Sequence, residues 1–201
     1  MHHHLLLFSI VFGLSTAAAA QSGDSPAEPR SSGGTPAWLP RGAFLGTYLR
    51  GGAITPQARL QWEVTFFEKR KDALVLLVDG GVGWAAGLPD TAVEGAKARI
   101  DSFYEHTLMV GLGYRNQSPD GLHWGFQVTG GPVWYGAYFR NRLHETENAG
   151  LVEGRIQVGH RFGPVVLGVS GGYGEPFSFR RRSVSRQFMG GALFGFFADW
   201  R

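Results

Sequence analysis

The chain has 201 residues, no cysteine and a formal net charge of +3. This length suits one domain with its own interior, and the lack of cysteine excludes disulfides, thiolate metal sites, cysteine nucleophiles and a lipidated N-terminal cysteine. The small, dispersed positive charge is atypical of nucleic-acid-binding proteins. Glycine contributes 31 residues and aromatic side chains 13% of the chain, which favours many strands joined by tight turns over helices.

The first twenty residues have the pattern of a cleavable secretory signal peptide. An apolar core at residues 5–14 is followed by Ser, Thr and four alanines, which predicts cleavage after Ala20. The core is too short to span a bilayer as a helix. His2, His3 and His4 stand where such a peptide usually carries Lys or Arg, so a tag remnant or a misplaced start codon is an alternative origin for this region.

Residues 21–41 are rich in Pro, Gly and Ser and nearly devoid of apolar side chains. A stretch of this composition does not bury enough surface to offset its ordering entropy, so it is predicted to be a disordered leader. The folded domain is therefore expected at residues 42–201.

Eight strand-like segments follow the leader. They are expected at residues 43–50, 57–68, 73–85, 102–115, 122–139, 151–162, 165–174 and 187–201. Short turns are predicted at 68–72, 116–121 and 163–164, and longer polar connections at 86–101, 140–150 and 175–186. The connection at 51–56 belongs with the long set by position but is short.

Each segment alternates with a period of two, which is the side-chain repeat of a β-strand. In the fourth segment, for example, Leu108, Val110 and Leu112 share one face and Glu105 and Thr107 lie on the other. Every segment thus has one apolar face and one face that is polar or rich in glycine.

The last segment, Q-F-M-G-G-A-L-F-G-F-F-A-D-W-R, carries Phe194, Phe196 and Trp200 on one face and places an aromatic residue one position before the C-terminus. With the alternation and the unequal connections, this strand resembles the small eight-stranded outer-membrane β-barrels of Gram-negative bacteria, of the OmpX and OmpA transmembrane-domain type, over residues 43–201. The resemblance implies an all-β, antiparallel, up-and-down transmembrane barrel with periplasmic termini. It also implies recognition of the C-terminal strand by the barrel-assembly machinery.

A soluble periplasmic lipocalin-like barrel that binds a small apolar ligand would show the same period with its apolar faces inward. Alternation alone does not orient the faces. Aromatic residues near strand ends, including Trp84, Tyr104, Tyr114 and Trp124, favour the membrane-spanning alternative because they match interfacial girdles.

Charged residues on the polar faces are expected to form a salt-bridge network inside the barrel, because buried charges are costly unless they are paired. No open pore is expected, since side chains fill the interior of an eight-stranded barrel. The predicted network comprises Arg59, Glu63, Asp79, Glu105, Glu153, Arg155 and Arg161.

Arginines cluster in the longer connections, which the scheme places at one rim. Because arginine binds phosphate bidentately, contact with outer-membrane lipids, and with lipopolysaccharide phosphates in particular, is a hypothesis for this rim. The candidate residues are Arg140, Arg142, Arg180, Arg181, Arg182 and Arg186.

Catalysis is not indicated. An outer-membrane lipid hydrolase is a third alternative, but it needs Ser, His and an acid at one rim, and His106, His123, His144 and His160 fall in different parts of the predicted layout. The His-x-Ser pairing of the lipid A deacylase barrels is absent. No cofactor or metal is predicted, and the expected role is structural or surface-interacting and non-enzymatic.

Overall fold

The computed structural model describes residues 38–86, 88, 90–93, 96–139, 142–177, 183 and 185–200. All of these residues belong to one compact unit, Gly34–Arg201. The signal peptide predicted at 1–20 and the leader up to residue 37 lie outside the described residues. In the described part of the chain, no helix has the length and apolar character needed to cross a membrane.

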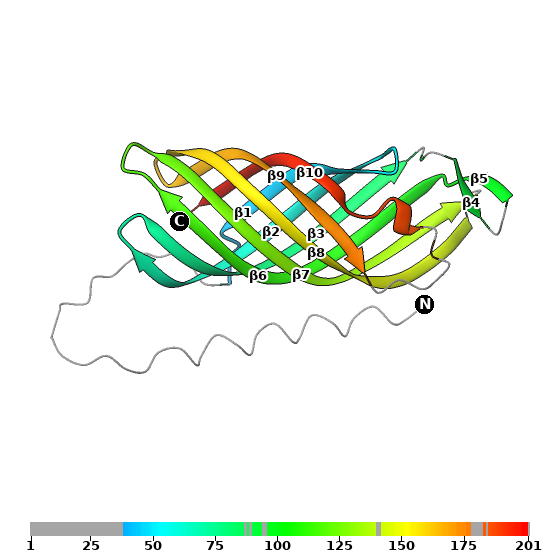
Figure 1. Ribbon diagram of the computed structural model, residues 1–201, viewed down its shortest axis with the longest axis horizontal. Coiled ribbons are helices and arrows are strands. Elements are labelled where there is room, and N and C mark those ends of the chain that lie inside the picture. The colour runs from blue at the N-terminus through cyan, green and yellow to red at the C-terminus, as the bar shows by residue number, and fades with distance from the viewer. Residues whose placement is uncertain are drawn as a thin grey trace. The chain divides into compact units, whose positions relative to one another are not determined.

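Eight antiparallel strands close into a barrel, in which β1 pairs with β10 and every other barrel strand pairs with its neighbours along the chain (Figure 1). The barrel strands are β1 Gly42–Arg50, β2 Ala53–Lys69, β3 Asp72–Ala86, β6 Ser102–Gln117, β7 Leu122–Phe139, β8 Arg142–Phe162, β9 Val165–Phe177 and β10 Gly191–Trp200. A separate pair, β4 Asp90–Val93 and β5 Ala96–Arg99, lies in the connection between β3 and β6. The predicted all-β, eight-stranded, up-and-down architecture is confirmed.

The two ends of the barrel differ in their connections. At one end, here called the turn end, β1 begins, β10 ends, and short turns join β2 to β3, β6 to β7 and β8 to β9. The opposite end, here called the loop end, carries the connections that contain β4–β5 and the short 3-10 helix η2 Ser185–Gln187. This asymmetry is the one predicted from the spacing of the segments.

The short connection between β1 and β2 at the loop end has a local cause. Gly51 and Gly52 form it with φ values of 59° and 79°. Two consecutive positive φ values are required by the tight hairpin turns that match strand twist, and glycine adopts them without a steric penalty. A two-residue turn therefore replaces a longer loop here.

Two predicted boundaries at the loop end were wrong. Most of the polar loop expected at 140–150 is strand, because β8 starts at Arg142 and pairs with β7 from there to His160. The last strand starts at Gly191 and not at residue 187, because Gly190 and Gly191 have positive φ values of 71° and 95° and redirect the chain. Phe188 and Met189 thus point into the barrel's buried core.

The apolar faces point outward. On β6, Val110 and Leu112 are exposed whereas Glu105, Thr107 and Met109 are buried. This orientation is the reverse of a lipocalin, so that alternative is wrong for this chain. Other outward-facing apolar residues include Leu45, Leu60, Val82, Phe126, Val152, Ile156, Val169, Phe194 and Phe196.

Candidate functional site

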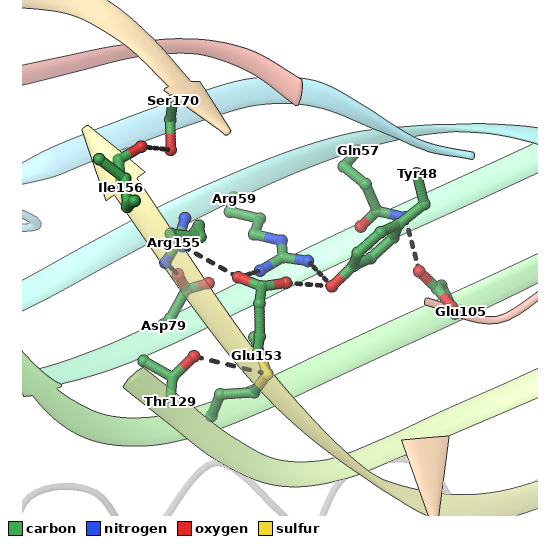
Figure 2. Close-up of polar contacts among 11 residues, drawn as sticks. Tyr48, Gln57, Arg59, Asp79, Glu105, Thr129, Glu153, Arg155, Ile156 and Ser170 are labelled. Carbon is green, nitrogen blue, oxygen red and sulfur yellow. Dashed lines mark hydrogen bonds and ion pairs between the residues drawn. The ribbon is translucent and has the colours of Figure 1, made fainter. Parts of the chain in front are cut away.

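Buried ionic side chains meet inside the barrel at about mid-length (Figure 2). Glu153 on β8 is their centre: its Oε1 lies 3.0 Å from Arg59 Nη1 and 2.9 Å from Arg155 Nε. Arg155 also donates to Asp79 on β3. Strands far apart in the sequence therefore share one ionic cluster, defined here as the lumen cluster, with Tyr48 as its fifth member.

Tyr48 on β1 completes the coordination of Glu153. Its hydroxyl donates to Glu153 Oε2 and accepts a hydrogen bond of 2.9 Å from Arg59 Nη2. Both guanidinium groups also lie over the Phe44 ring, at 5.9 Å for Arg59 and 5.5 Å for Arg155. Aromatic faces attract cations most strongly where water is excluded, so Phe44 adds to the stability of the cluster.

A second polar contact lies beside this cluster. Gln57 on β2 donates a hydrogen bond of 2.6 Å to Glu105 on β6. The two side chains meet across Gly83 of the intervening strand, where an added Cβ would overlap the Gln57 amide. Glycine is thus required on β3 so that polar groups from its two neighbours can meet.

Buried apolar side chains lie on both sides of the lumen cluster. Toward the turn end lie Leu77, Val166 and Phe197, each at most 3% exposed. Toward the loop end lies a buried apolar group that includes Phe103, Tyr135, Leu151, Phe188 and Leu193. Toward the turn end, buried polar side chains such as Gln127 and Gln157 lie among these apolar ones, so side chains of both kinds fill the interior, as expected for an eight-stranded barrel.

The structure brings together most of the predicted ionic residues, but two lie elsewhere. Glu63 pairs with Arg115 toward the turn end, apart from the lumen cluster. Arg161 is exposed, because β8 has already left the enclosed section two residues before the turn at Gly163. Including Arg161 in an interior network was therefore wrong. The sequence reasoning missed Tyr48 and Gln57, whose only signal was that they share the inward face with the charges.

The arginines proposed for phosphate binding are only partly described. Arg140, Arg180, Arg181 and Arg182 lie outside the described residues. Arg142 begins β8 at the loop end, and Arg186 is exposed on η2 and interacts electrostatically with Glu175.

Arg50, which the sequence reasoning did not select, lies at the same end. It forms a bidentate ion pair with Glu175, with N–O distances of 2.9 and 3.1 Å. Among the described arginines of the loop end, Arg50 and Arg186 therefore both interact with Glu175.

No hydrolase constellation is formed by the side chains that the structure describes. His106 lies beside Tyr104 on the outer face, His123 packs near Phe197 inside the turn end, and His160 lies by Phe162 at the turn end. His144 is part of β8 at the loop end. Within the described residues, no three His, Asp or Glu side chains group as a metal site requires.

A serine and an acid do meet at the loop end. Ser185 Oγ donates to Glu145 Oε2 at 2.6 Å, and the Ser185 backbone amide donates to the same oxygen at 3.0 Å. A nucleophilic serine must instead give its proton to a base such as histidine. The Glu145 carboxylate acts here as a cap for η2, because it accepts from both donors at the start of that helix.

Neither a protein-family model nor a curated protein matches the chain. In fold the chain is similar to the crystal structure of the outer membrane enzyme PagL, with a TM-score of 0.52 and 12% sequence identity over 80% of this chain and 98% of that one. At this identity the likeness shows the fold alone: the architecture is that of an eight-stranded outer-membrane barrel. Sequence comparison adds no support for membership of the OmpX and OmpA type.

Proposed function

We propose that this protein spans the bacterial outer membrane and acts without catalysis, as a structural or surface-interacting barrel. The observation that carries the proposal is the inversion of polarity: apolar side chains cover the outside, and paired charges lie within. Only hydrocarbon makes such an exterior favourable, since every exposed apolar group costs free energy in water.

Aromatic side chains near both ends of the barrel support a membrane-spanning orientation. Tyr104 and Tyr138 contact each other near the loop end, with ring centroids 6.1 Å apart, and Tyr114 and Trp124 do so near the turn end, at 5.2 Å. Tyrosine and tryptophan prefer the two membrane interfaces. The first strand, β1, begins at the turn end and the last, β10, ends there, so the turn end faces the periplasm and the loop end faces outward.

The loop end is the region we propose for surface contacts. Exposed Arg186 and the Arg50–Glu175 pair lie there, and arginine suits the phosphates of outer-leaflet glycolipid. The arginines at 140, 142 and 180–182 belong to the same proposal by their position in the chain. Recognition of the C-terminal strand by the assembly machinery is also proposed, because β10 must pair with β1 to close the barrel.

Fractionation of expressing cells tests the location. The protein is expected in the outer-membrane pellet and is expected to migrate differently on SDS gels before and after boiling, because a closed barrel resists detergent until it is heated. Recovery in the soluble periplasmic fraction with no mobility shift would contradict the proposal.

Incubation with purified lipopolysaccharide tests the absence of catalysis. We expect mass spectrometry to detect no released fatty acid, because the described histidines lie at separate places on the barrel. Stoichiometric or catalytic release of an acyl chain would instead establish a hydrolase and would direct attention to His144 and Ser185.

A further inference from the structure

The β2–β3 hairpin ends in three consecutive cations at the turn end of the barrel. Lys69, Arg70 and Lys71 are all exposed and are called here the cationic tip. Lys69 pairs with Asp72, so Arg70 and Lys71 are the two residues of the turn itself. The tip therefore presents its charge to the surroundings at the end that we place in the periplasm.

Arg70 departs from the usual chemistry of a tight turn. Its φ is 56°, and in the part of the chain that the structure describes it is the one residue other than glycine with a positive φ. This conformation costs free energy for a residue with a Cβ, and tight hairpin turns therefore favour glycine, asparagine or aspartate. The two other turns at this end follow that preference, with Gly121 at 91° and Gly163 at 63°. An arginine at such a position indicates that its charge has a use beyond folding.

Two exposed aromatic side chains stand next to the tip. The register of β2 with β3 shifts between Thr65 and Phe67, and Phe66 is the extra residue of this bulge. Phe66 and Phe67 are 60% and 51% exposed. Phe67 pairs with Leu74, which pairs in turn with Tyr114 of the aromatic pair near the turn end. Both phenylalanines therefore lie at the level of the proposed membrane interface.

The cations follow directly after this apolar level. Lys69 lies two residues beyond Phe67, which is about 7 Å along an extended strand. Lysine and arginine that cluster beside the apolar part of a membrane attract anionic headgroups, and arginine binds phosphate with two parallel hydrogen bonds. The order of aromatic and then cationic residues thus suits a phospholipid, with its chains beside the phenylalanines and its phosphate beside the tip.

The acids near the tip leave it an excess of positive charge. Residues 68–72 contain three cations and two acids. The Asp72 carboxylate accepts hydrogen bonds of 2.6 Å from Tyr114 Oη and from Asn116 Nδ2, so two donors of the barrel wall compensate its charge. Glu68 is exposed beside Lys69 and is the acid expected to repel an anion from the tip.

We propose that the cationic tip binds the phosphate groups of anionic phospholipid in the periplasmic leaflet, with Phe66 and Phe67 in the adjoining acyl region. The inference rests on the proposed membrane location and orientation, which bring the tip to that leaflet. It assigns the turn end a lipid class different from the glycolipid proposed for the loop end.

Fluorescence quenching tests the proposal on the full-length barrel in phosphatidylcholine vesicles. Because the chain has no cysteine, Ser118→Cys carries a single fluorophore. This position is beside the tip, since the amide of the preceding residue, Gln117, donates to the Lys71 carbonyl at 2.8 Å. The probes are phosphatidylglycerol and phosphatidylcholine, each with a nitroxide near the headgroup, and the ratio of their quenching measures the local enrichment of the anionic lipid. A separate label at Val110→Cys, quenched by a nitroxide deep in the chain, reports insertion.

Four changes alter the charge near the tip. Arg70→Gly removes one cation and relieves the turn, the combination of Arg70→Gly with Lys69→Gln and Lys71→Gln removes all three, and Glu68→Gln removes the repelling acid. Arg161→Gln is the matched control, because it removes an exposed cation from a different turn at the same end. A boiling-dependent mobility shift identifies the variants that remain folded.

The parent is expected to give a quenching ratio several-fold above one. Arg70→Gly should lower the ratio by up to about five-fold, the contribution of one surface cation, while raising the unfolding midpoint in guanidinium. The triple variant should bring the ratio close to one, Glu68→Gln should raise it, and Arg161→Gln should leave it unchanged. A stabilised Arg70→Gly variant with a lower ratio separates lipid binding from a structural role.

A ratio close to one in the parent, or a high ratio that persists in the triple variant, would overturn the proposal for the tip. Quenching at Val110→Cys would in either case leave the membrane location intact. Absence of quenching at Val110→Cys would instead overturn the membrane location itself.

Discussion

Replacing Arg155 by leucine is expected to be among the most damaging single changes in the barrel. Arg155 donates to Asp79 and lies 2.9 Å from Glu153, and all three side chains are at most 1% exposed. Glu153 would keep Arg59 and Tyr48, but Asp79 would lose the guanidinium that compensates its charge. Removing one partner of a buried ion pair costs about 3–5 kcal/mol, a factor of roughly a hundred to a few thousand in the folding equilibrium.

Guanidinium unfolding of the barrel in vesicles, followed by tryptophan fluorescence, measures this cost. The double variant Arg155→Leu, Asp79→Leu should recover at least half of it, because an apolar replacement of a whole buried pair is often near neutral. Asp79→Leu alone should be worse than the double variant, since it leaves two buried guanidinium groups of the lumen cluster, Arg59 and Arg155, on the single carboxylate of Glu153. A loss below about 1 kcal/mol for Arg155→Leu, or no recovery in the double variant, would refute the claim that pairing stabilises the lumen cluster.

Three further predictions concern the wall and the interior. Val110→Arg, on the outer face at the middle of β6, should destabilise the barrel by about 2–4 kcal/mol in vesicles, whereas Ile54→Arg near the loop end should cost only about 0–1 kcal/mol. Equal costs would contradict a membrane-spanning orientation of the strands. Gly111→Ala should reduce the free energy of unfolding by about 1–3 kcal/mol, because its Cβ would strike the Val128 carbonyl and the backbone of Thr129. Gly154→Ala should stay within about 0.5 kcal/mol of the parent, because nothing lies within 4 Å of its Cβ. Unfolding midpoints in guanidinium that ranked the two variants the other way would show that the strand register is wrong. The reconstituted protein should give no discrete conductance steps in planar bilayers, since buried side chains fill the interior on both sides of the lumen cluster. Steps that disappear on boiling the sample would refute the filled interior.

The fold could be predicted because strand alternation is a local property of the chain. β7 was placed at its observed bounds, Leu122–Phe139, because apolar residues alternate along it almost without interruption. The start of β8 was missed because residues 142–150 lack an apolar face, and hydrogen bonding to β7, not side-chain pattern, makes them a strand. The start of β10 was missed for the opposite reason: Phe188 and Met189 are as apolar as a strand, and the bend depends on the backbone of Gly190 and Gly191.

The sequence could predict which charged residues face the interior, but not which of them pair with each other. The sequence indicates which charged residues share the inward faces, but Arg155 and Asp79 are 76 positions apart and their contact depends on the registers of β3, β6, β7 and β8 together. The registers of β2 with β3 and of β3 with β6 likewise decide that Glu63 meets Arg115. Contacts across several strands are therefore set by barrel closure, which no single segment encodes.

The pairing of β1 with β10 has a consequence for biosynthesis. Gly42 faces Asp199 and Leu49 faces Ala192, so the cylinder is sealed by the first and the last strands of the domain. A chain that stops before β10 would present two unpaired strand edges, whose amide and carbonyl groups have no partner in hydrocarbon. Closure therefore requires β10, and a chain that stops before residue 191 is expected to form no closed barrel.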